Sequence, residues 1–187
     1  MKVTLNFKIL RFLLIPTILF STPFLNNIQD AKAGLEFQWD QNSGHRRLKW
    51  LQKQNKRNFR NKIYFFLRPF DRNSDLLKIN LAIPKHFKST LNEDKISLCK
   101  VKIGGFEERT KCLQDVPADI EINTDESSLR SINIYPYKPI PSNKDSYAIV
   151  LKVINPRKSG LYQFHSYGQP KGESVSSYLG SWTIVID

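Results

Sequence analysis

Tyr147-Ala-Ile-Val-Leu-Lys-Val-Ile154 is the stretch of sequence that decides the fold. It is almost wholly apolar and rich in β-branched residues, which predicts a strand buried on both faces. Asn155-Pro156 and Gly160 mark the turn that leaves this strand. Residues 161–167 predict the returning strand, and residues 179–186, apolar at alternate positions, predict a closing strand with one buried face.

The same pattern recurs upstream in shorter pieces. Residues 63–67 are apolar on both faces and predict another central strand. Residues 77–83 place leucine and isoleucine at every second position, starting with Leu77, which predicts a half-buried strand. With little helical pattern, no repeat and no linker, residues 34–187 predict one all-β domain. We expect a single antiparallel β-sandwich, immunoglobulin-like, of about nine or ten strands.

Three segments fit this scheme less simply. Residues 43–62 fit an amphipathic helix and two edge strands equally well. Tyr135-Pro-Tyr-Lys-Pro-Ile-Pro141 is rich in proline, which has no N–H to donate, so an exposed loop without ladder pairing is expected there. Residues 85–91 predict one short helical turn.

Cys99 and Cys112, the only cysteines, flank a Gly104-Gly105 turn signal. If Gly105 and Phe106 form a two-residue type II′ loop, residue 99 faces residue 112 across an antiparallel pair. Facing Cβ atoms lie about 4.5–5.5 Å apart, close to the separation that a disulfide requires. We therefore expect a Cys99–Cys112 disulfide, which would remove both thiols from catalysis and from copper binding.

The N-terminus is typical of an exported protein. Basic residues precede an apolar run at 12–20, and Ala31-Lys32-Ala33 fits a small-x-small cleavage site. We expect residues 1–33 to be a signal peptide cleaved after Ala33. The alternative is an uncleaved anchor, although the apolar run is shorter than the ~18–20 residues of a membrane span. The destination would be the periplasm, the thylakoid lumen or the medium, where disulfides persist.

Positive charge is concentrated in one segment. The whole chain carries a net charge of +12, and residues 46–72 hold ten bases and one acid. Beyond the expected signal peptide, the remaining bases and acids balance, so we expect any anionic partner to contact this segment. The candidate binding residues are Arg46, Arg47, Lys49, Trp50, Lys53, Lys56, Arg57, Arg60 and Lys62.

Several ordered motifs carry a family resemblance. They include Leu35-Glu-Phe-Gln-Trp-Asp40, Tyr64-Phe-Phe-Leu-Arg-Pro69, Ile96-Ser-Leu-Cys99, Gly160-Leu-Tyr-Gln-Phe164 and Tyr178-Leu-Gly-Ser-Trp182. Together they resemble the cyanobacterial secreted family known as domain of unknown function 2808, over nearly all of residues 34–187. The resemblance implies a cyanobacterial source and an exported protein, and it implies no particular chemistry.

Motifs for catalysis are absent from the sequence. There is no Gly-x-Ser-x-Gly elbow, and a blue-copper site would want a free thiolate and often a methionine, of which Met1 is the only one. No enzyme activity and no cofactor are expected. One alternative is a metal (copper) carrier or an unrecognised hydrolase with a site near His165, Tyr167 and Tyr178.

The leading interpretation is an exported, non-enzymatic protein of the cell envelope. It would bind an anionic polysaccharide, a lipid surface or an envelope protein through the basic segment, and nucleic acid is not expected outside the cytoplasm. A second alternative is a structural subunit of an envelope or thylakoid-lumen assembly.

Overall fold

A computed structural model describes residues 46–105, 107–126 and 128–187. These residues form ten β-strands and two short 3-10 helices. The strands are β1 (Trp50–Gln52), β2 (Arg60–Leu67), β3 (Leu76–Ile83), β4 (Ile96–Lys102), β5 (Lys111–Val116), β6 (Ala118–Thr124), β7 (Arg130–Pro136), β8 (Tyr147–Ile154), β9 (Gly160–Pro170) and β10 (Ser177–Ile186). The helices are η2 (Pro69–Asp71) and η3 (Glu93–Lys95).

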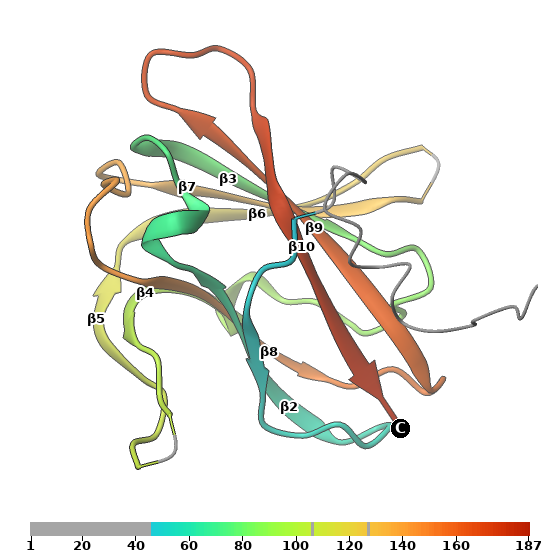
Figure 1. Ribbon diagram of the computed structural model, residues 1–187. Coiled ribbons are helices and arrows are strands. Elements are labelled where there is room, and N and C mark those ends of the chain that lie inside the picture. Colours follow the sequence, from blue (N-terminus) through green and yellow to red (C-terminus); the bar gives the residue numbers. More distant parts are fainter. Residues whose placement is uncertain (1–45, 106, 127) are drawn as a thin grey trace, which may run out of the picture. The chain divides into compact units, whose positions relative to one another are not determined.

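The strands form two five-stranded sheets, ordered β1-β2-β8-β4-β5 and β10-β9-β3-β7-β6 (Figure 1). All the pairs of neighbouring strands within these sheets are antiparallel. The predicted all-β, immunoglobulin-like sandwich is therefore confirmed, and so is the number of strands. The expected signal peptide, residues 1–33, lies outside the described residues.

Large aromatic side chains from both sheets meet in the core. The ring of Phe65 in β2 lies 4.9 Å from that of Trp182 in β10 and 5.0 Å from that of Phe164 in β9, measured between centroids. Trp182 is fully buried, and its indole N–H donates to the main-chain oxygen of Phe66 at 3.2 Å. This hydrogen bond joins one sheet to the other. It also satisfies the indole N–H, which burial would otherwise leave without a partner.

The cysteine hairpin differs from its predicted register. Cys99 and Cys112 are bonded, but Cys112 lies opposite Val101, and the ladder shifts register between Lys100 and Val101. The prediction of a two-residue loop is wrong, since β4 ends at Lys102 and β5 begins at Lys111.

Local hydrogen bonds explain the longer loop. The N–H of Gly104 donates to the hydroxyl of Thr110 at 2.9 Å, and the N–H of Gly105 donates to the oxygen of Glu108 at 3.1 Å. A Cβ at Gly104 would stand 2.3 Å from the Glu108 oxygen, so this turn needs glycine at that position. The two cysteines lie on either side of the bulge in the ladder, with their Cα atoms 5.7 Å apart.

Two further expectations were wrong in part. Residues 50–52 form a strand at the edge of their sheet, so the helical interpretation of residues 43–62 fails for the part described here. Within the proline-rich stretch, Ile140 is buried and exchanges two main-chain hydrogen bonds of 2.9 Å with Leu76. Pairing there is possible because the prolines lie beside Ile140, whose own N–H is free to donate.

Smaller departures concern residues 77 and 85–91. A register shift between Leu76 and Lys78 leaves Leu77 exposed, so the predicted alternation begins at Ile79 instead. In place of a helical turn, the N–H of Phe87 donates to the oxygen of Pro84 and closes a single tight turn.

Candidate functional site: a basic groove

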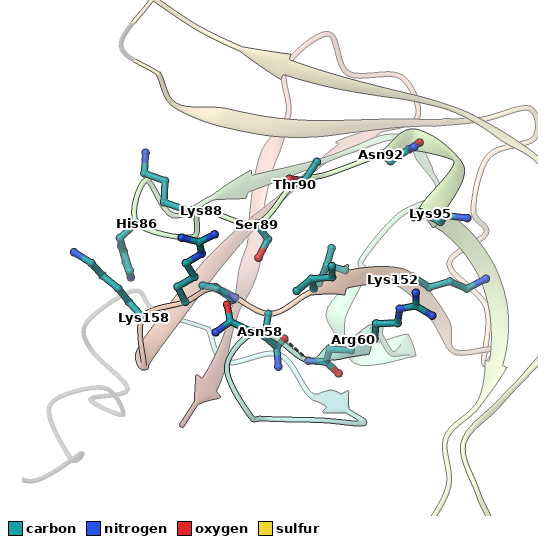
Figure 2. A pocket seen from close by; sticks show the side chains of 16 residues that line it. Asn58, Arg60, His86, Lys88, Ser89, Thr90, Asn92, Lys95, Lys152 and Lys158 are labelled. Atoms are coloured by element: carbon teal, nitrogen blue, oxygen red, sulfur yellow. Dashed lines mark hydrogen bonds between the residues drawn. The ribbon is translucent and has the colours of Figure 1, made fainter.

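Three connections of the chain meet at one end of the sandwich and enclose a groove. They are the β1–β2 turn, the β3–β4 connection and the start of the β8–β9 connection. They come together because Arg60 at the start of β2 pairs with Ile154 at the end of β8, and Leu151 of β8 pairs with Ile96 at the start of β4. The groove has a volume of about 1000 Å³ (Figure 2).

Basic side chains dominate the lining of this groove. Six bases line it, together with His86, and no aspartate or glutamate is among the described lining residues. The six, called here the groove bases, are Arg60, Lys88, Lys95, Lys152, Arg157 and Lys158. All six are exposed to solvent. Like charges around a concave surface concentrate a positive potential there and attract anions.

Between the bases the groove is neutral and polar. Asn58, Ser89, Thr90 and Asn92 also line it. The hydroxyl of Ser89 is buried and has no hydrogen-bond partner in the described structure. Asn58 has a φ of 60°, a left-handed conformation that asparagine adopts more readily than most residues and that suits it to the tight turn before β2. The lining therefore offers hydrogen-bonding groups as well as charge.

Buried amides support the groove from beneath. The side chain of Asn61 donates to that of Asn155 at 2.9 Å, and Asn155 in turn donates to the main-chain oxygens of Gln54 and Lys56. The side-chain oxygen of Asn61 accepts from the N–H groups of Lys53 and Gln54. These bonds fix the β1–β2 turn against the end of β8.

His86 is the one histidine among the lining residues. Its ring stacks on that of Tyr162 with centroids 4.9 Å apart, and its Nε2 lies 3.1 Å from the main-chain oxygen of Leu161. Both contacts fix the exposed imidazole at the groove, with one ring face against Tyr162.

Only one of the nine sequence candidates lines the groove, namely Arg60. Lys49 is exposed just before β1, and Lys53, Lys56 and Arg57 are exposed in the turn after it.

The remaining candidates have structural contacts. Arg46 lies 3.7 Å from the buried carboxylate of Asp71, and the ammonium of Lys62 lies 5.0 Å from the ring centre of Tyr64. Arg47 bridges to Ser181 of β10, and Trp50 packs against the core. The candidate residues of the predicted basic segment therefore do not form one site, because they lie in several different environments.

Five groove bases come from regions that the sequence analysis treated as neutral. They are Lys88, Lys95, Lys152, Arg157 and Lys158. In a count of charge along the chain, these bases are cancelled by acidic residues that do not line the groove in the fold. The turn signals after residues 83 and 154 could have indicated that these connections lie at one end of a sandwich, but only the strand pairing brings them together.

A model of the family described as "Protein of unknown function (DUF2808)" matches residues 39–186. The chain belongs to the DUF2808 family. The groove lies wholly within the matched region of this DUF2808 protein. A comparison with curated proteins finds no match.

Among the solved structures similar to this DUF2808 chain, three have low sequence identity to it. The collagen-binding domain of a Staphylococcus aureus adhesin is 12% identical, with a TM-score of 0.39, and the match covers 74% of this chain and 95% of that one. The bacterial hydrophobin BslA is 12% identical, with a TM-score of 0.43 and coverage of 75% and 97%. The collagen-binding subdomain of the Enterococcus faecalis surface protein ACE is 10% identical, with a TM-score of 0.39 and coverage of 74% and 95%.

The alternative site near His165 is a hydrogen-bonded cluster on β9 and β10. His165 Nδ1 lies 2.7 Å from the hydroxyl of Ser181, which lies 2.6 Å from the hydroxyl of Tyr178. The rings of Tyr167 and Tyr178 are 5.7 Å apart between centroids. The three predicted side chains are thus brought together, with Ser181 as a member that the sequence did not indicate.

Among residues 46–187, with residues 106 and 127 left aside, no group of three or more His, Cys, Asp or Glu side chains is arranged to hold a metal ion. Within the same residues, no helix has the length and apolar character needed to cross a membrane.

Proposed function

We propose that this DUF2808 protein is an exported binding protein of the cell envelope and that its basic groove holds an anionic ligand. The observation that carries the proposal is the lining itself, with six bases and no carboxylate around about 1000 Å³. Bases in most surface patches are interspersed with acids, whereas here the fold gathers them from three connections onto one concave surface.

The chemistry of the groove favours binding over catalysis. A general acid–base mechanism needs a group that titrates near neutral pH, and a covalent mechanism needs an activated nucleophile. Among the described lining residues, His86 is the one side chain of the type most often used for proton transfer, and no carboxylate lies among them to orient it. Lysine and arginine serve as fixed positive charges that pair with carboxylate, sulfate or phosphate groups.

The proposed exported location rests on the sequence of residues 1–33 and is supported by the disulfide. Cys99 and Cys112 are bonded, and such bonds persist in oxidising compartments outside the cytoplasm. Anionic polymers and surfaces of the envelope are accessible there.

Three lysine-to-glutamine triple variants of equal charge change test the proposed site on a heparin column. The groove variant combines Lys88→Gln, Lys152→Gln and Lys158→Gln. The segment variant combines Lys49→Gln, Lys53→Gln and Lys56→Gln, and a distal control combines Lys111→Gln, Lys144→Gln and Lys171→Gln. All nine lysines are exposed, so none of the changes should impair folding.

The proposal predicts that the groove variant elutes at a clearly lower salt concentration than either of the others. Equal shifts for all three variants would mean that retention follows net charge alone. A shift confined to the segment variant would return the site to residues 46–62. Either result would overturn the proposed site.

A further inference from the structure

The groove bases fall into two separate groups. Arg60, Lys152 and Lys95, which lie on β2, β8 and η3, form one group, here the strand group. Lys88, Arg157 and Lys158, which lie on the connections, form the loop group. Figure 2 shows Lys95, Lys152 and Arg60 on one side of the groove, and His86, Lys88 and Lys158 on the other. A compact anion is best held by bases that converge on one point, whereas the groove bases lie on two sides of the groove.

Neutral hydrogen-bonding groups lie between the two groups. Ser89 and Asn58 are seen between them in Figure 2, and Thr90 lies along the upper side. Asparagine amides both donate and accept hydrogen bonds, and the hydroxyls of serine and threonine do the same. Such a surface suits a ligand whose middle portion carries neutral hydroxyl groups.

The main chain of β8 adds to this surface. The N–H of Asn155 donates to the oxygen of Phe59 at 2.9 Å, so the peptide groups of Asn155 point toward β2. The direction of the peptide N–H and C=O groups alternates from residue to residue in an antiparallel ladder, so the peptide groups of Ile154 point away from β2, toward the β4 side. The described pairing between β8 and β4 ends at Leu151, so on the β4 side no strand of the described structure pairs with Ile154. Ile154 also lines the groove.

Other classes of anionic ligand fit this lining less well. Binding of single-stranded nucleic acid relies on aromatic side chains that stack on bases, and the lining has none apart from His86. Grooves that bind extended peptides carry apolar pockets for alternate side chains, whereas most of the residues lining this groove are polar. A lipid bilayer presents a broad surface of head groups and would leave facing walls of a groove unfilled.

We propose that the ligand is a linear anionic polysaccharide, bearing uronic carboxylates or sulfates, that lies along the groove and spans both groups of bases. Its charged groups pair with the strand group at one end and the loop group at the other. Its hydroxyls bond to Asn58, Ser89 and the free peptide edge at Ile154. This inference rests on the proposed function of the groove and specifies the class of polymer.

Calorimetric titration of the full chain with sulfated oligosaccharides of increasing length tests the inference. Heparin-derived di-, tetra- and hexasaccharides serve as probes, with inorganic sulfate, poly-glutamate and anionic phospholipid vesicles as alternatives. Two variants remove one group each: Arg60→Gln/Lys95→Gln/Lys152→Gln and Lys88→Gln/Arg157→Gln/Lys158→Gln. The distal triple variant at Lys111, Lys144 and Lys171 controls for net charge.

The expected affinity rises by about tenfold or more between di- and hexasaccharide, once a ligand can reach both groups. Each group variant should lose most of this gain, while the distal variant retains it. If per-molecule affinity does not rise with length, or poly-glutamate or vesicles bind more tightly at equal charge, the polysaccharide inference is overturned while anion binding in the groove stands. If no anionic probe binds, the proposed function fails as well.

Discussion

Asn61 and Asn155 share a buried side-chain hydrogen bond of 2.9 Å that joins the start of β2 to the residue after β8. Both amides also bond to the main chain of the β1–β2 turn. The floor of the groove is therefore a fully bonded polar pair, which holds two of its three connecting segments in place.

Asn155→Ala should destabilise the fold and disorder the groove. The change leaves the Asn61 amide and two main-chain oxygens without their partner, so the free energy of unfolding should fall by about 2–4 kcal/mol. Urea denaturation followed by tryptophan fluorescence measures this loss. The exposed Asn123→Ala is the matched control and should change stability by less than about 0.5 kcal/mol. A similarly small effect for Asn155→Ala would contradict the structural role given to the pair.

Arg72 should be irreplaceable by lysine. Its buried guanidinium donates to the main-chain oxygens of Leu67 at 2.7 Å and Asp145 at 2.8 Å, and lies 4.8 Å from the ring centre of Tyr147. Burial lowers the pKa of Arg72, although the charge of nearby Asp71 acts in the opposite direction.

Lysine cannot reproduce this planar fork, so Arg72→Lys should cost about 2–4 kcal/mol of unfolding free energy. The exposed Arg109→Lys is the control and should be neutral. Thermal unfolding of the two variants side by side decides the matter, and equal melting temperatures would count against the buried network.

Reduction of the Cys99–Cys112 disulfide should destabilise the protein without unfolding it at room temperature. The bond closes a segment with a sequence separation of 13, which in the chain-entropy model contributes about 3 kcal/mol. Urea midpoints with and without dithiothreitol measure the loss, and Cys99→Ala/Cys112→Ala should be insensitive to the reductant. Peptide mapping of unreduced protein from its native source should recover the bonded pair. Free thiols there would contradict both the bond and the proposed export.

Acid should weaken the contact between Lys100 and Asp145. Their side chains lie 2.7 Å apart, and the hydrogen bond from Lys100 lowers the pKa of Asp145. A lowered carboxyl pKa contributes stability above the unfolded value, about 4, and that contribution is lost as the pH falls through the folded value. Asp145→Asn should therefore lower the melting temperature at pH 6 but have a shrinking effect below about pH 4. The exposed Asp115→Asn is the control, and a constant difference between wild type and Asp145→Asn down to pH 2.5 would refute the linkage.

The sandwich could be predicted from the sequence because its strands carry their own signals. β8 is apolar along nearly its whole length, and β10 carries apolar side chains at alternate positions from Trp182 to Ile186, so the apolar pattern alone indicates that these strands face the core. The register of the β4–β5 hairpin could not be predicted in the same way. It depends on a bond from Gly104 to the Thr110 hydroxyl, which no periodicity reveals.

The candidate site was harder to predict for a related reason. Lys88 and Lys152 are far apart in the chain and reach one groove only because β8 continues past the start of β4. Sequence charge density pointed to residues 46–62 instead, where Arg46 is paired with Asp71 and Trp50 packs against the core. A local count of charge cannot show which bases a sandwich brings together at its end.

The most direct test of the groove as the binding site is an NMR titration of uniformly labelled protein with a sulfated hexasaccharide. The account predicts that amide shifts concentrate at residues 58–61, 86–95 and 152–158, with Ile154 among the largest. Shifts concentrated at residues 46–57, or scattered over all exposed lysines, would contradict it.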